Sequence, residues 1–234
     1  MNDCSDIKKH ITSVCLNGEY GDSGRITKFT SSHVYWYFSP ESVHTPDDIS
    51  HVKRIFEELY NIIGITFIQT HTRPNAPHIM LYFGNQETFQ SYIHENIQPN
   101  TLGYANWNAQ NDSIYRSHVF VSQTLTGIKR RDILREEITQ ALGNTGDTLY
   151  AHTLFYQYKS QSHDYYDKYF EIDVAILRFL YHPHTHPGMT REDLDSLDCD
   201  IVMERCVPLT YTTHYPSHFM GPKRMIALTL FIII

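Results

Sequence analysis

The sequence predicts an α+β domain in which helices pack against a mixed, twisted β-sheet. Two observations carry this prediction. Short runs of β-branched and aromatic residues, each closed by turn residues, have the composition of strands. Longer segments repeat apolar residues every three or four positions, which is the period of a helix with one buried face. The order of these elements, with a long helix after the last strand, favours a mixed sheet with helices against one face.

The first predicted strand covers residues 33–39, where HVYWYFS is followed by Pro40. A helix follows, capped by Thr45 or Asp47, with Pro46 near its first turn and Gly64 as its stop. Its apolar residues recur at helical spacing, so one face packs on the sheet. These residues are Ile49, Val52, Ile55, Phe56, Leu59 and Ile63.

Four further strands are predicted, and a short amphipathic helix over residues 86–97, ended by Pro99, divides them into two pairs. The four strands cover residues 65–70, 78–83, 101–107 and 114–122. A polar segment with Asn111 and Asp112 forms the turn between the last two.

The central helix is predicted over residues 127–142, with a core stripe of Leu134, Ile138 and Ala141 and a stop at Gly143. The polar, tyrosine-rich stretch 144–169 has the character of a functional loop. Its tyrosines would form an aromatic wall over a cleft or pack the loop onto the domain, and both readings remain open. They are Tyr156, Tyr158, Tyr165, Tyr166 and Tyr169.

Two more helices are predicted toward the C-terminus. The first covers residues 171–181, and the sharp turn HPHTHPGM follows it. The second covers residues 190–197 and opens with a capping box between Thr190 and Asp193. The chain then divides into a loosely ordered lead-in (1–30), the main domain (31–200) and a C-terminal extension (201–234) without an assigned structure.

Charge and motifs exclude several classes of function. The chain has 19 basic and 26 acidic residues, a net charge of −7, and its main basic run is 129–131. Because phosphate backbones require a dense basic face, we expect no nucleic-acid partner. The sequence has no GxSxG, P-loop or dinucleotide fingerprint, which disfavours serine hydrolase, NTPase and Rossmann chemistry.

Neither end of the chain predicts a membrane span. The N-terminus lacks the apolar core of a signal peptide. The apolar run IALTLFIII, residues 226–234, is shorter than the roughly 20 residues that cross a bilayer. We expect this run to be a terminal strand or part of a longer segment.

The four cysteines are Cys4, Cys15, Cys199 and Cys206, in two pairs toward the two ends of the chain. The absence of a CxxC spacing disfavours a zinc knuckle. An exported protein would form two local disulfides or one bridge that joins the ends, whereas a cytosolic protein would keep four free thiols. The sequence leaves these alternatives open.

The most informative segment is REEITQALG, residues 135–143. Glu136, Glu137 and Gln140 have the spacing that a zinc peptidase gives to its His, Glu and His. At about 100° per residue, Glu136 and Gln140 lie near each other on one face of the helix. Glu137 lies between that face and the core stripe. If the helix is only structural, Glu137 needs buried partners such as Arg135 or Arg178.

Three segments together resemble a bacterial family of uncharacterised proteins, several of them described as candidate lipoproteins, with a metzincin-like (zinc-metallopeptidase-like) fold. The segments are HVYWYF with ITFIQ, then LREEITQALGNTGD, then DVAILRFLYHPHTHPGM, which ends at Met189. The similarity covers residues 33–197. The family pattern has Glu-Glu-x-x-Gln-x-Leu-Gly where active metzincins have His-Glu-x-x-His-x-x-Gly-x-x-His. The resemblance implies a metzincin-like sheet with a motif-bearing central helix and a location in the bacterial cell envelope.

The resemblance also implies roles for single residues. Glu136 and Gln140 fall at the first two metal-ligand positions, Glu137 at the general base, and Gly146 or Asp147 at the third ligand. Met189 falls at the Met-turn under the metal. Zinc prefers imidazole or thiolate ligands, so this oxygen set disfavours zinc and would suit a harder divalent ion. Loop histidines could complete such a site, namely His152, His163, His182, His184 and His186.

Three functions follow from this motif. Its degenerate ligands favour a non-catalytic role in binding a peptide or protein, with an extended peptide along an edge strand, predicted as Ile114–Ser122. The first alternative is an active metal-dependent peptidase in which Glu137 takes a proton from metal-bound water. The second alternative is another hydrolase that uses paired carboxylates in an acidic cleft.

Overall fold

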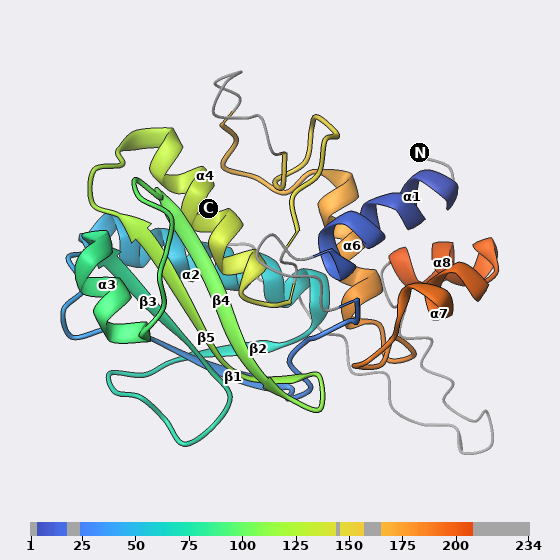
Figure 1. Cartoon of the computed structure of the whole chain (residues 1–234), viewed down its shortest axis with the longest axis horizontal. Helices are drawn as coiled ribbons and strands as arrows, with labels where there is room; N and C mark the ends of the chain where they lie inside the picture. The colour runs from blue at the N-terminus through green and yellow to red at the C-terminus, as the bar shows by residue number, and fades with distance from the viewer. Residues whose placement is uncertain (1–3, 18–23, 144–145, 157–164, 208–234) are drawn as a thin grey trace, which may run out of the picture.

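The computed structural model describes residues 4–17, 24–143, 146–156 and 165–207. His163, Tyr158 and the apolar run 226–234 lie outside these residues. A sheet with helices on both faces forms one part of the molecule, and helices from both ends of the chain pack together beside it (Figure 1).

Five strands form a mixed sheet in the order β2-β1-β3-β5-β4. β4 runs antiparallel to β5, and the other neighbouring strands are parallel. The predicted α+β class with a mixed sheet is therefore confirmed. The strands are β1 His33–Phe38, β2 Thr66–Gln69, β3 His78–Gly84, β4 Gly103–Gln110 and β5 Ser113–Ser122.

The prediction that Ile114–Ser122 forms an edge strand is wrong. β5 pairs with β3 on one side and with β4 on the other, so the two edges of the sheet are β2 and β4. The hairpin turn at Asn111 and Asp112, with φ angles of 51° and 59°, folds β4 back against β5. Positive φ at both positions is the requirement of a tight two-residue hairpin. β4 is the outer strand of this hairpin because β5 pairs with β3.

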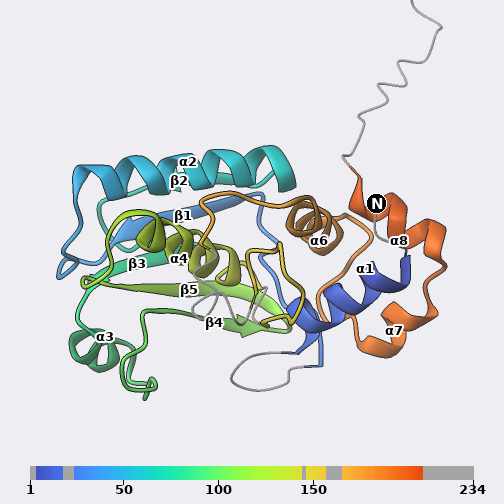
Figure 2. The same ribbon diagram turned by 90° about the horizontal axis from the view of Figure 1, so that it is seen from above.

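Two helices pack on one face of the sheet and a third packs on the other (Figure 2). α2 (Pro46–Ile63) and α4 (Gly127–Gln140) share a core cluster with β1, β3 and β5. On the opposite face, α3 (Gln86–Ile93) buries Phe89 against aromatic residues of the sheet. α3 is shorter than predicted because His94, at φ 59°, ends it with a left-handed cap.

The predicted caps of α2 are confirmed. The hydroxyl of Thr45 accepts a hydrogen bond from the Asp48 amide, and the carboxylate of Asp48 accepts one from the Thr45 amide. Gly64, at φ 75°, closes the helix in the left-handed conformation. These local signals set the residues at which α2 begins and ends.

A second group of helices joins the two ends of the chain. It holds α1 (Cys4–Ile11), the π-helix η1 (Thr12–Leu16), α6 (Glu171–Tyr181), α7 (Arg191–Ser196) and α8 (Cys199–Cys206). They share a hydrophobic cluster separate from that of α2 and α4. No helix in the described ranges is long and apolar enough to span a membrane.

The start of this group differs from the loosely ordered lead-in that the sequence predicts. Ile7, Ile11 and Val14 recur at four- and three-residue spacing, and the second cluster buries all three. The apolar stripe is only three residues long and lies among lysines and serines, so it is weak as a sequence signal. Packing against α6 and α8 supplies the stability that a short helix lacks on its own.

One disulfide joins the two ends of the chain. Cys4 of α1 is bonded to Cys199 of α8 across 195 residues of sequence, with 5.5 Å between their Cα atoms. Cys15 and Cys206 are buried thiols outside this disulfide, and both lie in the second hydrophobic cluster. Burial raises the pKa of both, that of Cys206 to about 11, so neither is a reactive thiolate near neutral pH.

Gly143→Ala is expected to lower the free energy of unfolding by about 2–4 kcal/mol. Gly143 has φ +110°, and a Cβ there would overlap the carbonyl oxygen of Thr27. Gly127→Ala is the matched control, because Gly127 also has positive φ, +59°, but no neighbour within 4 Å. It should cost only about 1 kcal/mol. Equal midpoints of urea unfolding for the two variants would contradict the close packing of Gly143 on Thr27.

Candidate functional site

α4 presents three different faces to the rest of the protein. Leu134, Ile138 and Ala141 lie in the hydrophobic cluster under the sheet, as predicted. Every residue from Asp132 to Gln140 is buried, so the helix is enclosed on all sides. The polar residues of the motif therefore lie inside the protein.

Glu136, Glu137 and Gln140, the polar residues of the motif, have exposed fractions of 6–7%. Glu137 packs against the first residue of β4, because a Cβ on Gly103 would lie 2.9 Å from the Glu137 carboxyl carbon. Gly103 thus provides the space for this carboxylate. The motif face abuts β4 at close range.

The third face is a buried charged network centred on Arg135. Its guanidinium has no exposed surface, forms ion pairs with Glu58 of α2 and with Asp167, and stacks 4.7 Å from the ring of Tyr169. The Tyr169 hydroxyl lies 3.0 Å from Thr139 Oγ1, one turn along α4. Tyr169 therefore packs its loop onto the domain.

His51 extends the network from α2. Its Nδ1 accepts a hydrogen bond of 2.7 Å from Arg54, and its Nε2 lies 3.2 Å from Asp167 Oδ1. An arginine can only donate, so Nε2 carries the proton of a neutral imidazole and donates to the carboxylate. Burial lowers the pKa of His51, although Asp167 acts in the opposite direction. Together with Arg54 and Arg135, His51 holds Asp167, and with it the segment 165–169, against α2 and α4.

The stretch after α4 packs on the N-terminal segment. Gly146 donates to the Val14 carbonyl at 3.0 Å, and a Cβ on Gly146 would overlap carbonyl oxygens of Ser13 and Asn17. Asp147, predicted as a third metal ligand, follows at a half-buried position. The π-helix η1 and its C-terminal cap thus set the path of the chain leaving α4.

The predicted loop histidines form a tight turn at the end of α6. The rings of His182 and His184 are 5.3 Å apart, and His186 Nδ1 lies 3.0 Å from the carbonyl of Pro187. Burial and the neighbouring His184 and Arg205 lower the pKa of His182. Glu204 acts on this pKa in the opposite direction.

Lys28 lies beside this turn with its ammonium buried. It donates to the carbonyls of Leu180, at 2.8 Å, and Thr185. Burial, reinforced by Arg205, lowers the pKa of Lys28 to about 8. Two main-chain carbonyls at the end of α6 are thus satisfied by one side chain.

Met189, the predicted Met-turn residue, lies in the second hydrophobic cluster with α6, α7 and α8. Its carbonyl accepts from the Ile26 amide at 2.8 Å, and the Ile26 carbonyl accepts from the Gly188 amide at 2.8 Å. The core stripe of α4 belongs to the other cluster.

The side-chain atoms that the motif offers as ligands show whether it fits a metal ion. Within the described ranges, no three His, Cys, Asp or Glu side chains come close enough to hold an ion. Glu136 and Gln140 offer a carboxylate and an amide oxygen, a poor set for zinc. The described residues therefore do not fit a zinc centre, and no catalytic step follows from them.

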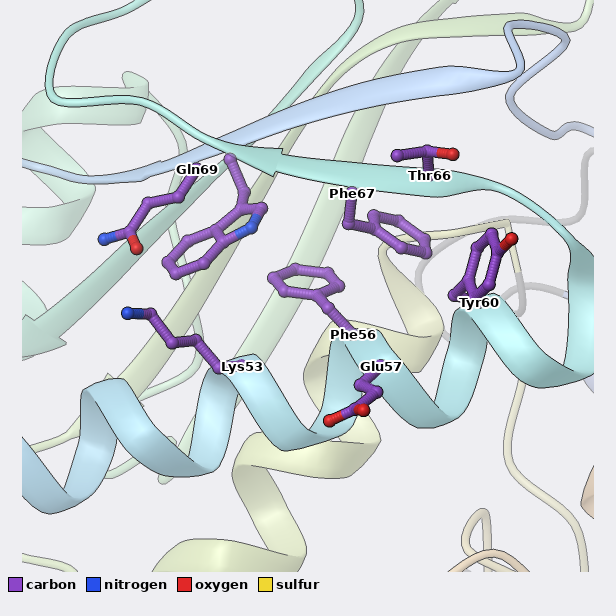
Figure 3. A pocket seen from close by; sticks show the side chains of 8 residues that line it. Lys53, Phe56, Glu57, Tyr60, Thr66, Phe67 and Gln69 are labelled. Atoms are coloured by element: carbon purple, nitrogen blue, oxygen red, sulfur yellow. The ribbon is translucent and has the colours of Figure 1, made fainter. Parts of the chain in front are cut away.

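A cavity of about 460 Å³ lies elsewhere, between α2 and the edge strand β2 (Figure 3). Its floor is aromatic: the Trp36 and Phe56 ring centroids are 5.2 Å apart, and Phe56 and Phe67 are stacked at 4.6 Å. Lys53 and Gln69 lie at one end and Tyr60 at the other. Its volume is in the usual range for ligand sites.

The main chain of β2 completes this site. The amides of Thr66 and Thr70 donate to β1, at the carbonyls of Ser32 and Trp36. Because successive residues of a strand alternate, Phe67 and Gln69 turn their N–H and C=O groups away from β1. The same two residues point their side chains into the cavity. Among the described strands, β2 has no neighbour on its outer side, so an open strand edge and an apolar pocket occur together.

Sequence reasoning missed this cavity. Trp36 belongs to the first predicted strand and is only 2% exposed, yet its ring forms part of the cavity wall. The available signal was the presence of aromatic residues in β1, α2 and β2, namely Trp36, Phe56 and Phe67. It becomes a site only when the three elements are brought together.

A scan against protein-family models matches residues 5–197 to one family, described as Protein of unknown function (DUF2927). A search of curated proteins found no match. The matched range includes the central helix, α6, α7, the disulfide-linked α1 after Cys4 and the whole sheet. The chain belongs to the DUF2927 family.

Proposed function

We propose that this protein binds an extended peptide segment of a partner along the outer edge of β2, and that it is metallopeptidase-like without being a peptidase. The observation that carries the proposal is the aromatic cavity directly beside the free backbone groups of Phe67 and Gln69. Addition of a strand to an exposed sheet edge is a recurring mode of peptide recognition.

The geometry of β2 defines which peptide fits. A strand added beside β2 would exchange hydrogen bonds with the main chain of Phe67 and Gln69. Alternate side chains of that strand would then point to the α2 side of the sheet. We therefore expect a peptide with two apolar or aromatic residues at positions i and i+2.

The rim of the cavity adds polar selectivity. Lys53 and Glu57 are exposed on α2 and carry opposite charges, while Gln69 offers an amide. An apolar floor with a polar rim is the common anatomy of a protein interface. A peptide with small or polar residues in place of the two apolar ones would lack the burial that drives binding.

The motif on α4 supports a structural role over catalysis. Glu136, Glu137 and Gln140 are nearly enclosed, and their donor set suits zinc poorly. A general base must reach the proton that it abstracts, which requires access for water and substrate. The similarity to metzincins would then describe an inherited fold whose chemistry has been lost.

The disulfide supports a location in an oxidising compartment. A bond between Cys4 and Cys199 is stable outside the cytosol and is reduced within it. This agrees with the bacterial cell envelope implied by the family resemblance. A partner peptide would come from another envelope or extracellular protein.

Gln69→Pro is expected to weaken peptide binding at least about tenfold, because proline removes the outward N–H that an added strand needs. The probe is a peptide selected by panning a displayed library of random short peptides on the purified protein. Affinity is measured by calorimetry. Proline is tolerated at this position because the Gln69 amide faces away from β1.

Gln69→Thr is the matched control, since it changes the side chain but retains the N–H. It should lose only the contribution of the side-chain amide, and it should bind the selected peptide at least about threefold more tightly than Gln69→Pro does. The proposal fails if panning enriches no peptide, or if both variants bind as tightly as the wild type. Melting curves of both variants verify that the fold is intact.

A further inference from the structure

A group of basic and polar side chains lies on the face of the sheet that α3 covers in part. The strand register places His78 of β3 opposite Arg116 of β5, and Arg116 opposite Asn108 of β4. Two residues further along β5, His118 lies opposite Asn106 of β4. Side chains at positions 116 and 118 share one face because they are two residues apart. These residues therefore form one continuous surface.

The two histidines are held in a single tautomer by the protein. His78 Nδ1 lies 2.7 Å from the Ala76 carbonyl, and His118 Nδ1 lies 3.0 Å from Asn106 Oδ1. Both acceptors lack a proton, so both Nδ1 atoms carry one. Each Nε2 atom is therefore a lone pair that can take up a proton. That of His78 is buried and meets no donor in the described part of the chain.

Arg73 and Arg116 supply positive charge to this surface. Burial, followed by the charges of Arg116, His78 and Arg73, lowers the pKa of His118 to about 3. Burial and the same two arginines also lower the pKa of His78, against the effect of its bond to Ala76. Four basic groups are thus close enough to repel one another.

No described carboxylate forms an ion pair with either arginine, and Arg116 Nε donates to Asn108 Oδ1 at 2.9 Å. One carboxylate, Glu95, joins the border of the surface. It accepts hydrogen bonds of 2.8 Å from the Tyr104 hydroxyl and from Asn106 Nδ2. Tyr92 lies nearby as a hydrogen-bond partner of Tyr37. The surface therefore carries concentrated positive charge with little compensation.

We propose that Arg73, His78, Arg116 and His118 form a binding site for an oxyanion, the phosphate or carboxylate group of a ligand. Guanidinium groups bind such anions through charge-assisted, often bidentate hydrogen bonds. The bound negative charge would oppose the effects of burial and of the arginines on His78, whose Nε2 is the buried atom without a donor, so the pKa of His78 would rise on binding. The site lies on the opposite face of the sheet from the cavity at β2 and is independent of it.

The test is calorimetric titration of the purified protein with sodium phosphate, sodium sulfate and sodium acetate at low ionic strength. Phosphate or acetate as the tighter ligand identifies the natural group as a phosphate or a carboxylate. Sulfate does not titrate near neutral pH. Calorimetry in buffers of different ionisation enthalpy measures how many protons are taken up when sulfate binds, and these protons are therefore bound by the protein. Sulfate binding should tighten as pH falls from about 8 to 6, because bound sulfate raises the pKa of His78.

Arg73→Gln and Arg116→Gln should each weaken anion binding at least about tenfold. Arg131→Gln is the control, because Arg131 is an exposed arginine of α4, paired with Asp47 on the other side of the sheet. Arg73 lies in an exposed loop, so its variant remains informative if Arg116→Gln destabilises the fold. Absence of binding for all three anions, or equal affinities for the Arg73 and Arg131 variants, would overturn the proposal.

Discussion

Reduction of the Cys4–Cys199 disulfide is expected to lower the free energy of unfolding by about 3–5 kcal/mol. The bond spans 195 residues, so it removes a large amount of chain entropy from the unfolded state. It also ties α1 to α8, and both are short helices that depend on mutual packing. Urea unfolding with and without a reductant measures the change.

The double variant Cys4→Ser with Cys199→Ser is the control for this experiment. It should match the reduced wild type and should not respond to the reductant, because the remaining thiols, Cys15 and Cys206, are buried and take no part in a disulfide. Equal unfolding midpoints for oxidised and reduced wild type would show that the bridge does not stabilise the fold. A response of the double variant to the reductant would point to another disulfide.

Arg135→Met is expected to cost about 3–5 kcal/mol of stability, the second large effect. The substitution removes a fully buried guanidinium and leaves the carboxylate of Asp167, itself 11% exposed, without that ion pair. It also removes the stack on Tyr169 that holds the loop after residue 165. Thermal and urea unfolding measure the loss.

Arg131→Met provides a matched control on the same helix. Its ion pair with Asp47 is 3.3 Å long, and the two side chains are 45% and 72% exposed. Exposed pairs of this kind contribute between zero and about 1 kcal/mol. If the two variants were equally stable, the network around Arg135 would not be what fixes α4 against α2 and the loop.

Local signals in the sequence were sufficient for most of the sheet and for α2. The capping box at Thr45, the stop at Gly64 and the β-branched runs act over a few residues, and each is found where it was predicted. The edge of the sheet was misassigned because strand order depends on a hairpin that returns β4 to the outside. Periodicity alone carries no information about which neighbour a strand takes.

The surroundings of α4 needed contacts between distant parts of the chain. Arg135 was predicted as a partner of Glu137, and it pairs with Glu58, 77 residues away, and with Asp167, 32 residues away. The spacing of Glu136 and Gln140 places them near each other on one face of the helix, with Glu137 between that face and the core stripe. It could not predict that this face would be enclosed, because the covering residues belong to other segments.

Metal binding by Glu136, Gln140 and Asp147, with Glu137 as general base, stays a prediction of the sequence motif. The same is true of His182, His184 and His186 as supplementary ligands and of Met189 as a Met-turn. The proposed binding role makes no use of these residues. It relies on Phe67, Gln69 and the aromatic floor beside them.

The affinity of one selected peptide for Glu137→Gln and for Gln69→Pro tests this assignment most directly. We expect Glu137→Gln to bind as tightly as the wild type, because the Glu137 carboxylate packs on β4 and not at β2. We expect Gln69→Pro to lose binding. Loss of binding in Glu137→Gln, with normal binding in Gln69→Pro and intact melting curves for both, would place the site at α4 and contradict the assignment to β2.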